Sequence, residues 1–289
     1  MTDPSLRDRA VRLYDAFTHE HRDRRTLLRE MTALAGSVAA AEALIAGIGA
    51  SPAVAALTAP DDVRLLTRVV KGNAAGHPSI AYLARPRAGR GKLGTVMVIH
   101  ENRGLNDHIR DVARRVALAG FRVVAPDFLG PWGGTPADED KAREMIAKAD
   151  YDVVIAQGLA MLEEVRDGGK AGLIGFCWGG ALVNRLAVAG GKAIDAAVAY
   201  YGPAPAPSEA TKVEAPMLLH YAGKDTRVAQ TGEPWVAALR AAGKTVEAFT
   251  YPGVDHAFNN DTSAERYDKA AATLAWERSI AFLHKYLDG

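Results

Sequence analysis

The apolar positions divide the chain into two differently patterned parts. Residues 1–60 are rich in alanine and show no strand pattern. Within them, apolar residues recur at helical spacing and predict a helix over 6–17: Leu6, Ala10, Leu13 and Phe17. From about residue 62 the pattern changes to alternation, over 63–70 and 79–83, which predicts two strands joined by a hairpin-like turn. We therefore expect a helical extension or signal-like segment over 1–60 and a main domain over 61–289.

Strands and helices alternate through the rest of this main domain. Short apolar runs, as expected for strands buried on both faces, are followed by stretches with helical spacing. The predicted strands are 94–100, 121–125, 171–176, 194–200, 216–221 and 245–251, and the predicted helices are 107–118, 139–166, 181–189, 235–242 and 263–286. This order predicts an α/β fold with a mostly parallel central sheet and helices on both faces.

Three reactive side chains each follow a different predicted strand. Cys177 follows the strand over 171–176, Asp225 comes shortly after the strand over 216–221, and His256 comes shortly after 245–251. In an open parallel sheet, reactive groups collect outside the carboxyl ends of the strands. The chain order of nucleophile, acid and histidine is that of the α/β-hydrolase triad.

The single cysteine of the chain lies in the stretch Gly-Phe-Cys-Trp-Gly-Gly, residues 175–180. This is the thiol form of the G-x-S-x-G nucleophile elbow, a strand-to-helix turn so tight that the flanking positions must lack bulky side chains. The turn places Cys177 at a helix N-terminus, where the positive end of the helix dipole favours a thiolate. The backbone N–H of Trp178 would then face a developing oxyanion.

Each of these residues also has a plainer interpretation. Free cysteine is often a buried and inert thiol, and a lone histidine is often structural. Asp225 alone would be an ordinary turn residue, and Asp255 competes with it as the triad acid. A residue adjacent in sequence to His256 points its side chain elsewhere, so Asp225 is preferred.

Taken together, these residues resemble the dienelactone hydrolase family, also called carboxymethylenebutenolidases, over about residues 62–288. The family has a G-[FY]-C-x-G-G elbow, a Cys-Asp-His triad and a glutamate after an early core strand, which here is Glu101 in the run His-Glu-Asn-Arg-Gly. The sequence is most similar to a subgroup with HENRG, YYG and HAFNND motifs and an N-terminal extension that bears an Arg-Arg pair. The resemblance implies an α/β-hydrolase fold and hydrolysis of ester or lactone bonds.

The resemblance also implies a role for each residue of the site. Glu101 would help to deprotonate Cys177 when substrate arrives, and the thiolate would attack the carbonyl carbon. The N–H groups of Trp178 and Asn102 would hold the oxyanion. His256, oriented by Asp225, would protonate the leaving group and then activate water. A loop carboxylate paired with Arg103 is the alternative interpretation of Glu101.

One position departs from the family pattern. The dienelactone enzymes hold the substrate carboxylate with arginines, one of which lies four residues after the catalytic histidine; here that residue is Asn260, which brings no charge. Arg103 is a candidate replacement, with a solvated loop arginine as the alternative. The aromatic residues expected to shape the substrate pocket are Trp132, Trp178, Tyr201 and Phe258, although packing is an equally good explanation for each.

Composition narrows the class of partner. Of 289 residues, 48% are hydrophobic and 24% charged, and the net charge of +1 offers no basic field for nucleic acid or an anionic membrane. One cysteine excludes an internal disulfide and a thiolate zinc cage. The histidines are scattered, so the sequence implies no metal and no organic cofactor. The expected partner is a small ester or lactone, and the expected assembly is a monomer or homodimer.

The N-terminal part leaves localisation open. Arg24 and Arg25, followed by an alanine-rich run and the Ala-Val-Ala of residues 53–55, are similar to a twin-arginine export signal. Glu30 and Glu42 interrupt the apolar segment, which favours a retained helical extension and a cytoplasmic protein. A periplasmic location through a twin-arginine-like signal is the alternative.

Three other functions compete with the dienelactone hydrolase interpretation. A promiscuous carboxylesterase would use the same triad without dienelactone activity. A thiol peptidase or amidotransferase also places cysteine on an elbow, but usually has histidine directly after it, where this chain has Trp178. A non-catalytic binding protein on the same fold would be expected to lack a member of the triad, and all three are present.

Overall fold

A computed structural model describes residues 5–20, 22–49, 57–88 and 93–288. Its strands are β1 (Leu65–Ala74), β2 (His77–Pro86), β3 (Thr95–Ile99), β4 (Arg122–Asp127), β5 (Ala171–Phe176), β6 (Ala196–Tyr200), β7 (Met217–Ala222) and β8 (Val246–Tyr251). Its α-helices are α1 (Leu6–His19), α2 (Arg24–Ala35), α3 (Val38–Ile48), α4 (Asp107–Leu118), α5 (Glu139–Ala147), α6 (Tyr151–Arg166), α7 (Trp178–Gly190), α8 (Thr226–Ala241) and α9 (Lys269–Leu287).

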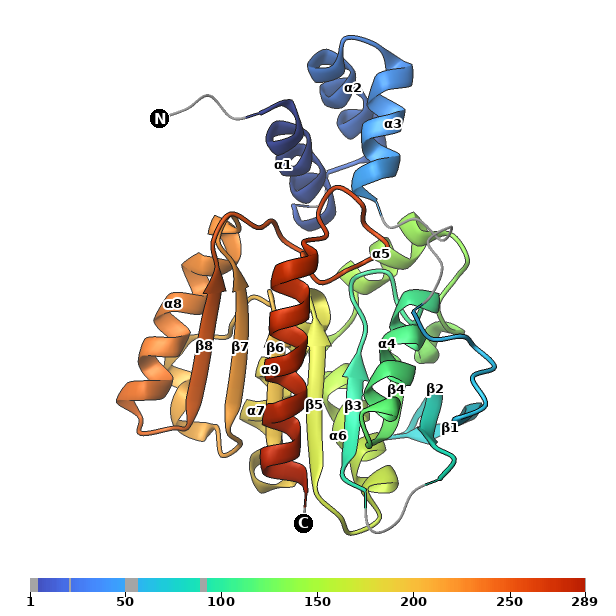
Figure 1. The fold of residues 1–289 in the computed structure, drawn as a ribbon, viewed down its shortest axis with the longest axis vertical. Helices are drawn as coiled ribbons and strands as arrows, with labels where there is room; N and C mark the ends of the chain where they lie inside the picture. Colours follow the sequence, from blue (N-terminus) through green and yellow to red (C-terminus); the bar gives the residue numbers. More distant parts are fainter. Residues whose placement is uncertain (1–4, 21, 50–56, 89–92, 289) are drawn as a thin grey trace.

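The strands form one 8-stranded sheet in the order β1-β2-β4-β3-β5-β6-β7-β8. The β1–β2 and β2–β4 pairs are antiparallel, and all pairs from β4 to β8 are parallel. The predicted α/β fold with a mostly parallel sheet is confirmed. The parallel strands all end at the upper edge of the sheet in Figure 1.

Helices cover both faces of the sheet. Along β3, Val96 and Val98 pack in one apolar cluster with residues of α4 and α9, whereas Met97 and Ile99 pack in a second cluster with residues of α6, α7 and α8. This two-sided burial explains why the central strands read as continuous apolar runs rather than as alternating ones. Figure 1 shows α9 crossing one face of the sheet from the upper edge to the lower one.

Several boundaries differ from the predicted ones, and the largest differences are in helices. The helix predicted over 139–166 is two helices, because Asp150 caps the start of α6 by accepting from the N–H of Asp152. Helix α8 begins at Thr226, well before the predicted residue 235, and it contains Pro234. The helix predicted from residue 263 begins at Lys269, after the N-cap Asp268.

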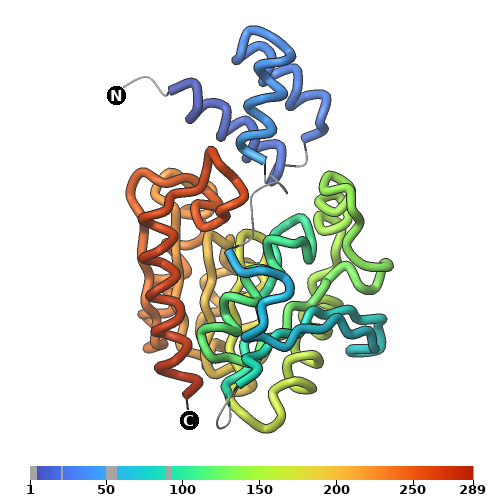
Figure 2. The backbone as a smooth tube through the Cα atoms, turned by 45° about the vertical axis from the view of Figure 1, so that its right-hand side comes forward, coloured from blue at the N-terminus to red at the C-terminus, as the bar shows by residue number. Residues whose placement is uncertain are grey.

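Helices α1 to α3 stand over the edge at which the parallel strands end, as Figures 1 and 2 both show. The helix predicted over 6–17 is α1. The three helices share a small apolar cluster of their own. Ion pairs attach α1 to the main domain: Arg7 to Asp255 at 2.9 Å, Lys224 to Asp8 at 2.8 Å, and Arg266 to Asp15 at 3.3 Å.

The segment that is similar to an export signal lies mostly in α2 and α3, whereas residues 53–55 lie outside the described residues. In the described part of the chain, no single helix has the length and apolar content needed to cross a membrane. Helices α2 and α3 meet those criteria only as a pair, and they are bent by 112° where they join.

Candidate active site

Cys177 forms a strained turn between β5 and α7. It is the N-cap of α7 and has φ 54° and ψ −114°, a conformation that non-glycine residues rarely adopt. Its N–H donates to the carbonyl of Tyr200 at 3.0 Å, and its carbonyl accepts from the N–H of Ala181 at 3.0 Å. These bonds hold the turn, and the side chain is 5% exposed above the sheet edge.

The glycines around Cys177 are required by close backbone contacts. A Cβ on Gly175 would lie 2.4 Å from the carbonyl oxygen of Gly179, and a Cβ on Gly179 would lie 2.5 Å from the carbonyl oxygen of His100. Real Cβ atoms do not approach backbone this closely, so larger residues would push α7 away from the sheet. This is the steric reason for the glycine pattern that the sequence shows.

Asp225, and not Asp255, holds His256. The Nδ1 of His256 lies 2.5 Å from Oδ2 of Asp225, whose Oδ1 accepts from the N–H of Val228 at the start of α8. Asp255 instead accepts from Arg7 of α1 at 2.9 Å. Burial alone would raise the pKa of Asp225, but the charge and hydrogen bond of His256 outweigh it and lower that pKa.

The other ring nitrogen of His256 faces the thiol. Its Nε2 is buried and has no hydrogen-bond partner among the described residues. Burial alone would lower the pKa of His256, but a thiolate at Cys177 and the carboxylate of Asp225 raise it to about 10. The site therefore favours the protonated, imidazolium form of His256 beside Cys177.

Glu101 and Asn260 are partners in the wall of the site. Asn260 is buried, and its Nδ2 donates to Oε2 of Glu101 at 2.6 Å. Asn260, which stands where the family has an arginine, therefore orients the carboxylate of Glu101. Both residues line the cavity beside Cys177. Asn102 lines this cavity too, and the N–H of Trp178, the first residue of α7, has no partner within the helix.

Arg103 already has partners. Its guanidinium donates to Oε2 of Glu139 at 2.5 Å and to the hydroxyl of Tyr14 in α1. Only 10% of its side chain is exposed. The structure thus uses Arg103 to join α1 and α5 to the loop after β3, although it also lines the cavity beside Cys177.

Three of the predicted pocket aromatics do not line the cavities at Cys177. Trp132 is 47% exposed because its short 3-10 turn (Gly130–Trp132) holds it in solvent. Phe258 is fully buried in the core beside Tyr200 and Tyr251. Tyr201 is buried behind His256, with ring centroids 5.0 Å apart. Of the four predicted pocket aromatics, Trp178 is the one that lines a described cavity at Cys177.

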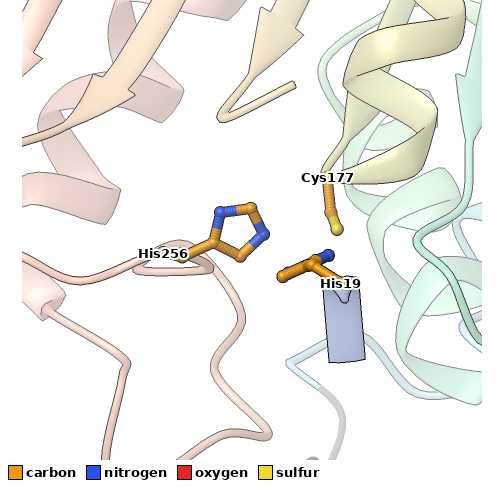
Figure 3. A group of neighbouring side chains, drawn as sticks. All are labelled: His19, Cys177 and His256. Carbon is orange, nitrogen blue, oxygen red and sulfur yellow. The ribbon is translucent and has the colours of Figure 1, made fainter. Parts of the chain in front are cut away.

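The sequence reasoning missed His19, the last residue of α1. Its ring lies 4.7 Å from that of His256, centroid to centroid, and its donor atom belongs with those of Cys177 and His256 to one group (Figure 3). Burial, and then the positive charges of His256 and Arg227, hold the pKa of His19 well below its usual range, so this imidazole is neutral. No local motif marks His19; only the docking of α1 brings it here.

Two cavities meet at Cys177. One, of about 20 Å³, has room for about a single water and is lined by Thr18 and His19 as well as by the residues around the thiol. The other, of about 270 Å³, has Tyr151 and Trp178 in its wall. Three arginines also line it: Arg143, Arg185 and Arg227. A larger hollow of about 790 Å³ along β1, β2 and β4 contains none of the predicted site residues.

The sheet order and the elbow between β5 and α7 define an α/β-hydrolase fold with a thiol at the nucleophile position. The family model described as "Dienelactone hydrolase family" matches residues 80–287. The chain therefore belongs to the dienelactone hydrolase family, as its motifs predicted.

Named relatives and solved structures agree with this membership. A "Putative carboxymethylenebutenolidase" of Escherichia coli K12 is 32% identical over 256 residues, which cover 82% of this chain and 93% of that protein. A protein of the same name from Salmonella typhi is 36% identical over 71% of this chain and 82% of its own length. The crystal structure of a "Putative Dienelactone Hydrolase" from Klebsiella pneumoniae has a TM-score of 0.70 at 31% identity, covering 77% of this chain and 99% of that one.

Proposed function

We propose that this protein hydrolyses carboxylic ester or lactone bonds through a thioester on Cys177, with His256 and Asp225 completing a triad. The observation that supports this most strongly is the chain of contacts itself. The thiol lies at a helix N-terminus beside the unpartnered Nε2 of His256, whose Nδ1 is 2.5 Å from Asp225. This is the nucleophile, base and orienting acid that acyl transfer needs.

The reaction proceeds in two acyl-transfer steps. The thiolate of Cys177 attacks the carbonyl carbon, and the N–H groups of Trp178 and Asn102 stabilise the oxyanion. When the tetrahedral intermediate collapses, the C–O bond to the alcohol breaks, and the proton on Nε2 of His256 passes to the leaving oxygen. His256 then takes a proton from water, the hydroxide attacks the thioester, and collapse returns the thiolate and the carboxylic acid.

Glu101 contributes a second carboxylate to this site. It lines the cavity beside Cys177 together with His256, and Asn260 holds it in place. We infer that Glu101 accepts the proton of the resting Cys177 thiol when substrate arrives, and so produces the thiolate that attacks. Glu101→Gln keeps the contact with Asn260 but removes the base, and it should lower kcat more than it raises KM.

The cavity of about 270 Å³ fits the acid part of a small substrate. Apolar side chains form much of its wall, and three arginines supply positive charge. The guanidinium carbon of Arg143 lies 4.1 Å from the centre of the Phe17 ring. That of Arg185 lies 4.3 Å from the centre of the Tyr151 ring. This positive wall favours substrates that carry a carboxylate. The uncharged Asn260 favours the second candidate, a general carboxylesterase without dienelactone activity.

Steady-state rates separate these two candidates. The purified protein is assayed on a dienelactone and on a neutral short-chain aryl ester, each with Cys177→Ala as control. A clear preference in kcat/KM for the dienelactone supports the carboxylate-binding enzyme, and turnover of the neutral ester alone supports the general esterase. Activity of Cys177→Ala on both substrates would contradict the thioester mechanism.

We also propose that α1 to α3 belong to the working enzyme and that the protein is cytoplasmic. Supporting this, Thr18 and His19 line the cavity at the nucleophile, so removal of the segment would leave the site open on one side. The intact mass of the protein from its native host tests the proposal. A mass that retains residues 1–55 supports it, and cleavage after Ala55 contradicts it.

A further inference from the structure

Two imidazoles and the thiol meet at one point above the sheet edge. One donor atom each from His19, Cys177 and His256 lies within 4.8 Å of the others. The three residues come from the end of α1, the N-cap of α7 and the loop after β8. Figure 3 shows the sulfur of Cys177 next to the His19 ring, with one ring nitrogen of His256 directed at both.

These donors have the chemistry of a zinc site. Thiolate and imidazole are the preferred ligands of Zn²⁺, at about 2.3 Å for sulfur and about 2.0–2.1 Å for nitrogen. Tetrahedral ligands at those lengths lie about 3.5 Å apart. Donor atoms separated by as much as 4.8 Å would have to close by about an ångström to reach that spacing. No carboxylate belongs to the group, which argues against the hard cations Ca²⁺ and Mg²⁺.

The surroundings of His256 also suit a metal ligand. Its Nδ1 is bonded to Asp225, the carboxylate–histidine arrangement that orients metal-binding imidazoles, while its buried Nε2 has no partner among the described residues. A cavity with room for about one water adjoins the group and can supply the fourth ligand.

We propose that His19, Cys177 and His256 form a reversible Zn²⁺ site that switches the enzyme off. Binding forms bonds from zinc to Sγ and to one nitrogen of each imidazole, and any proton held by those three atoms is released to solvent. The nucleophile and the base are then both occupied, so no thioester can form. The arginines of the neighbouring cavity weaken the binding of a dication, which makes the site exchangeable rather than structural. This inference goes beyond the proposed hydrolysis, and measurements of metal binding test it independently of that function.

Cobalt titration of the full-length protein tests the site directly. Co²⁺ bound as proposed gives a thiolate-to-cobalt charge-transfer band together with the visible bands of tetrahedral coordination, and Zn²⁺ displaces it. Cys177→Ser should abolish the charge-transfer band. His19→Ala and the more conservative His19→Gln should each weaken binding by at least about tenfold. His77→Ala, at the start of β2, is the matched control and should bind like the unaltered protein.

Each outcome bears on the proposal. Zn²⁺ should inhibit ester hydrolysis in proportion to occupancy, and EDTA should restore it. Unchanged Co²⁺ affinity in both folded His19 variants would overturn the three-ligand site, because it would show binding by the thiol and His256 alone. Absence of the charge-transfer band in the unaltered protein would overturn it as well. Metal binding by a protein that hydrolyses no ester would leave this site standing and reject the proposed function.

Discussion

Asp225 has two hydrogen-bonding partners, one for each carboxylate oxygen. Oδ2 holds Nδ1 of His256, and Oδ1 caps α8 through the N–H of Val228. Asp225→Asn keeps an oxygen for the cap but loses the charge that stabilises the imidazolium. We predict that kcat/KM on an aryl ester falls roughly 10²–10⁴-fold, while urea unfolding shows a loss of at most about 1 kcal/mol.

Asp255→Asn is the matched control for this prediction. It alters the carboxylate next to His256 in sequence, which pairs with Arg7 instead. Its activity should stay within a few-fold of the unaltered protein. A larger loss of activity in Asp255→Asn than in Asp225→Asn would show that Asp255, and not Asp225, orients His256.

At the residue scale, the sequence was informative where a side chain follows directly from a strand. Cys177, Asp225 and His256 lie beyond the ends of β5, β7 and β8, so their meeting follows from parallel pairing. Trp132 and Phe258 could not be placed in this way, because an aromatic ring packs equally well in a cavity wall, in the core or in solvent.

The turn between β5 and α7 is the element that sets the position of Cys177. A Cβ at Gly179 would lie 2.5 Å from the carbonyl oxygens of both Ile99 and His100. Because these are backbone atoms, moving them away would disturb the sheet. We predict that Gly179→Ala lowers the free energy of unfolding by about 1–3 kcal/mol and kcat by roughly tenfold or more. Urea unfolding and steady-state kinetics measure the two effects.

Gly72→Ala is the control for added bulk. The nearest atom to its Cβ would be Oγ of Ser79 at 3.6 Å, an ordinary contact. Its stability should change by less than about 0.5 kcal/mol. If both variants behaved alike, close packing at the elbow would not be the reason for Gly179.

A buried polar network ties β7 to β8 and α9. The Nε2 of His220 donates to Oγ of Ser279 at 3.0 Å, and its Nδ1 accepts from the hydroxyl of Tyr251 at 3.0 Å, a tautomer assigned because Ser279 already donates to the carbonyl of Ala275. Burial, and then the positive charge of Arg278, lowers the pKa of His220 to about 3.

The network predicts a loss of stability in acid. The folded state keeps His220 neutral, while the unfolded state binds a proton below its ordinary pKa of about 6.5. Stability from this group is therefore complete above pH ~6.5 and falls by up to about 1.4 kcal/mol per pH unit towards pH ~3. Urea midpoints between pH 7 and pH 4 should fall less steeply in His220→Gln; an identical slope would contradict the prediction.

At the element scale, strands were easier to predict than helix starts. The apolar runs of β3, β5 and β7 end where the predicted strands end, within a residue. The start of α8 was missed because Pro234 and polar residues obscure its periodicity, and the Asp225 cap is also a catalytic candidate. In a single sequence, an aspartate that caps a helix cannot be distinguished from an aspartate that takes part in catalysis.

At the scale of the whole molecule, α1 to α3 form a unit with its own apolar cluster, fixed to the hydrolase by ion pairs. Met31 is fully buried in that cluster. Met31→Ala should destabilise the unit by about 2–5 kcal/mol. Hydrogen exchange should then accelerate in α1 to α3 and stay unchanged in β3 to β7; uniform acceleration would show that the two parts unfold together.

The position of this unit could not be predicted from the sequence. Its helical pattern is visible, but the contacts that dock it join residues far apart in the chain, such as Arg7 with Asp255 and Tyr14 with Arg103. His19 lies beside Cys177 and His256 only because of that docking. The candidate triad was therefore predictable from the sequence. The position of α1 to α3 over that triad was not.

The most direct test of the thioester mechanism is to trap the acyl-enzyme. The protein is mixed with an activated acetyl ester, quenched in acid within the first turnover and digested for mass spectrometry. The mechanism predicts one acetyl group on the peptide that contains Cys177, and none in Cys177→Ala. Full turnover without acetylation of that peptide, or hydrolysis that persists in Cys177→Ala, would contradict it.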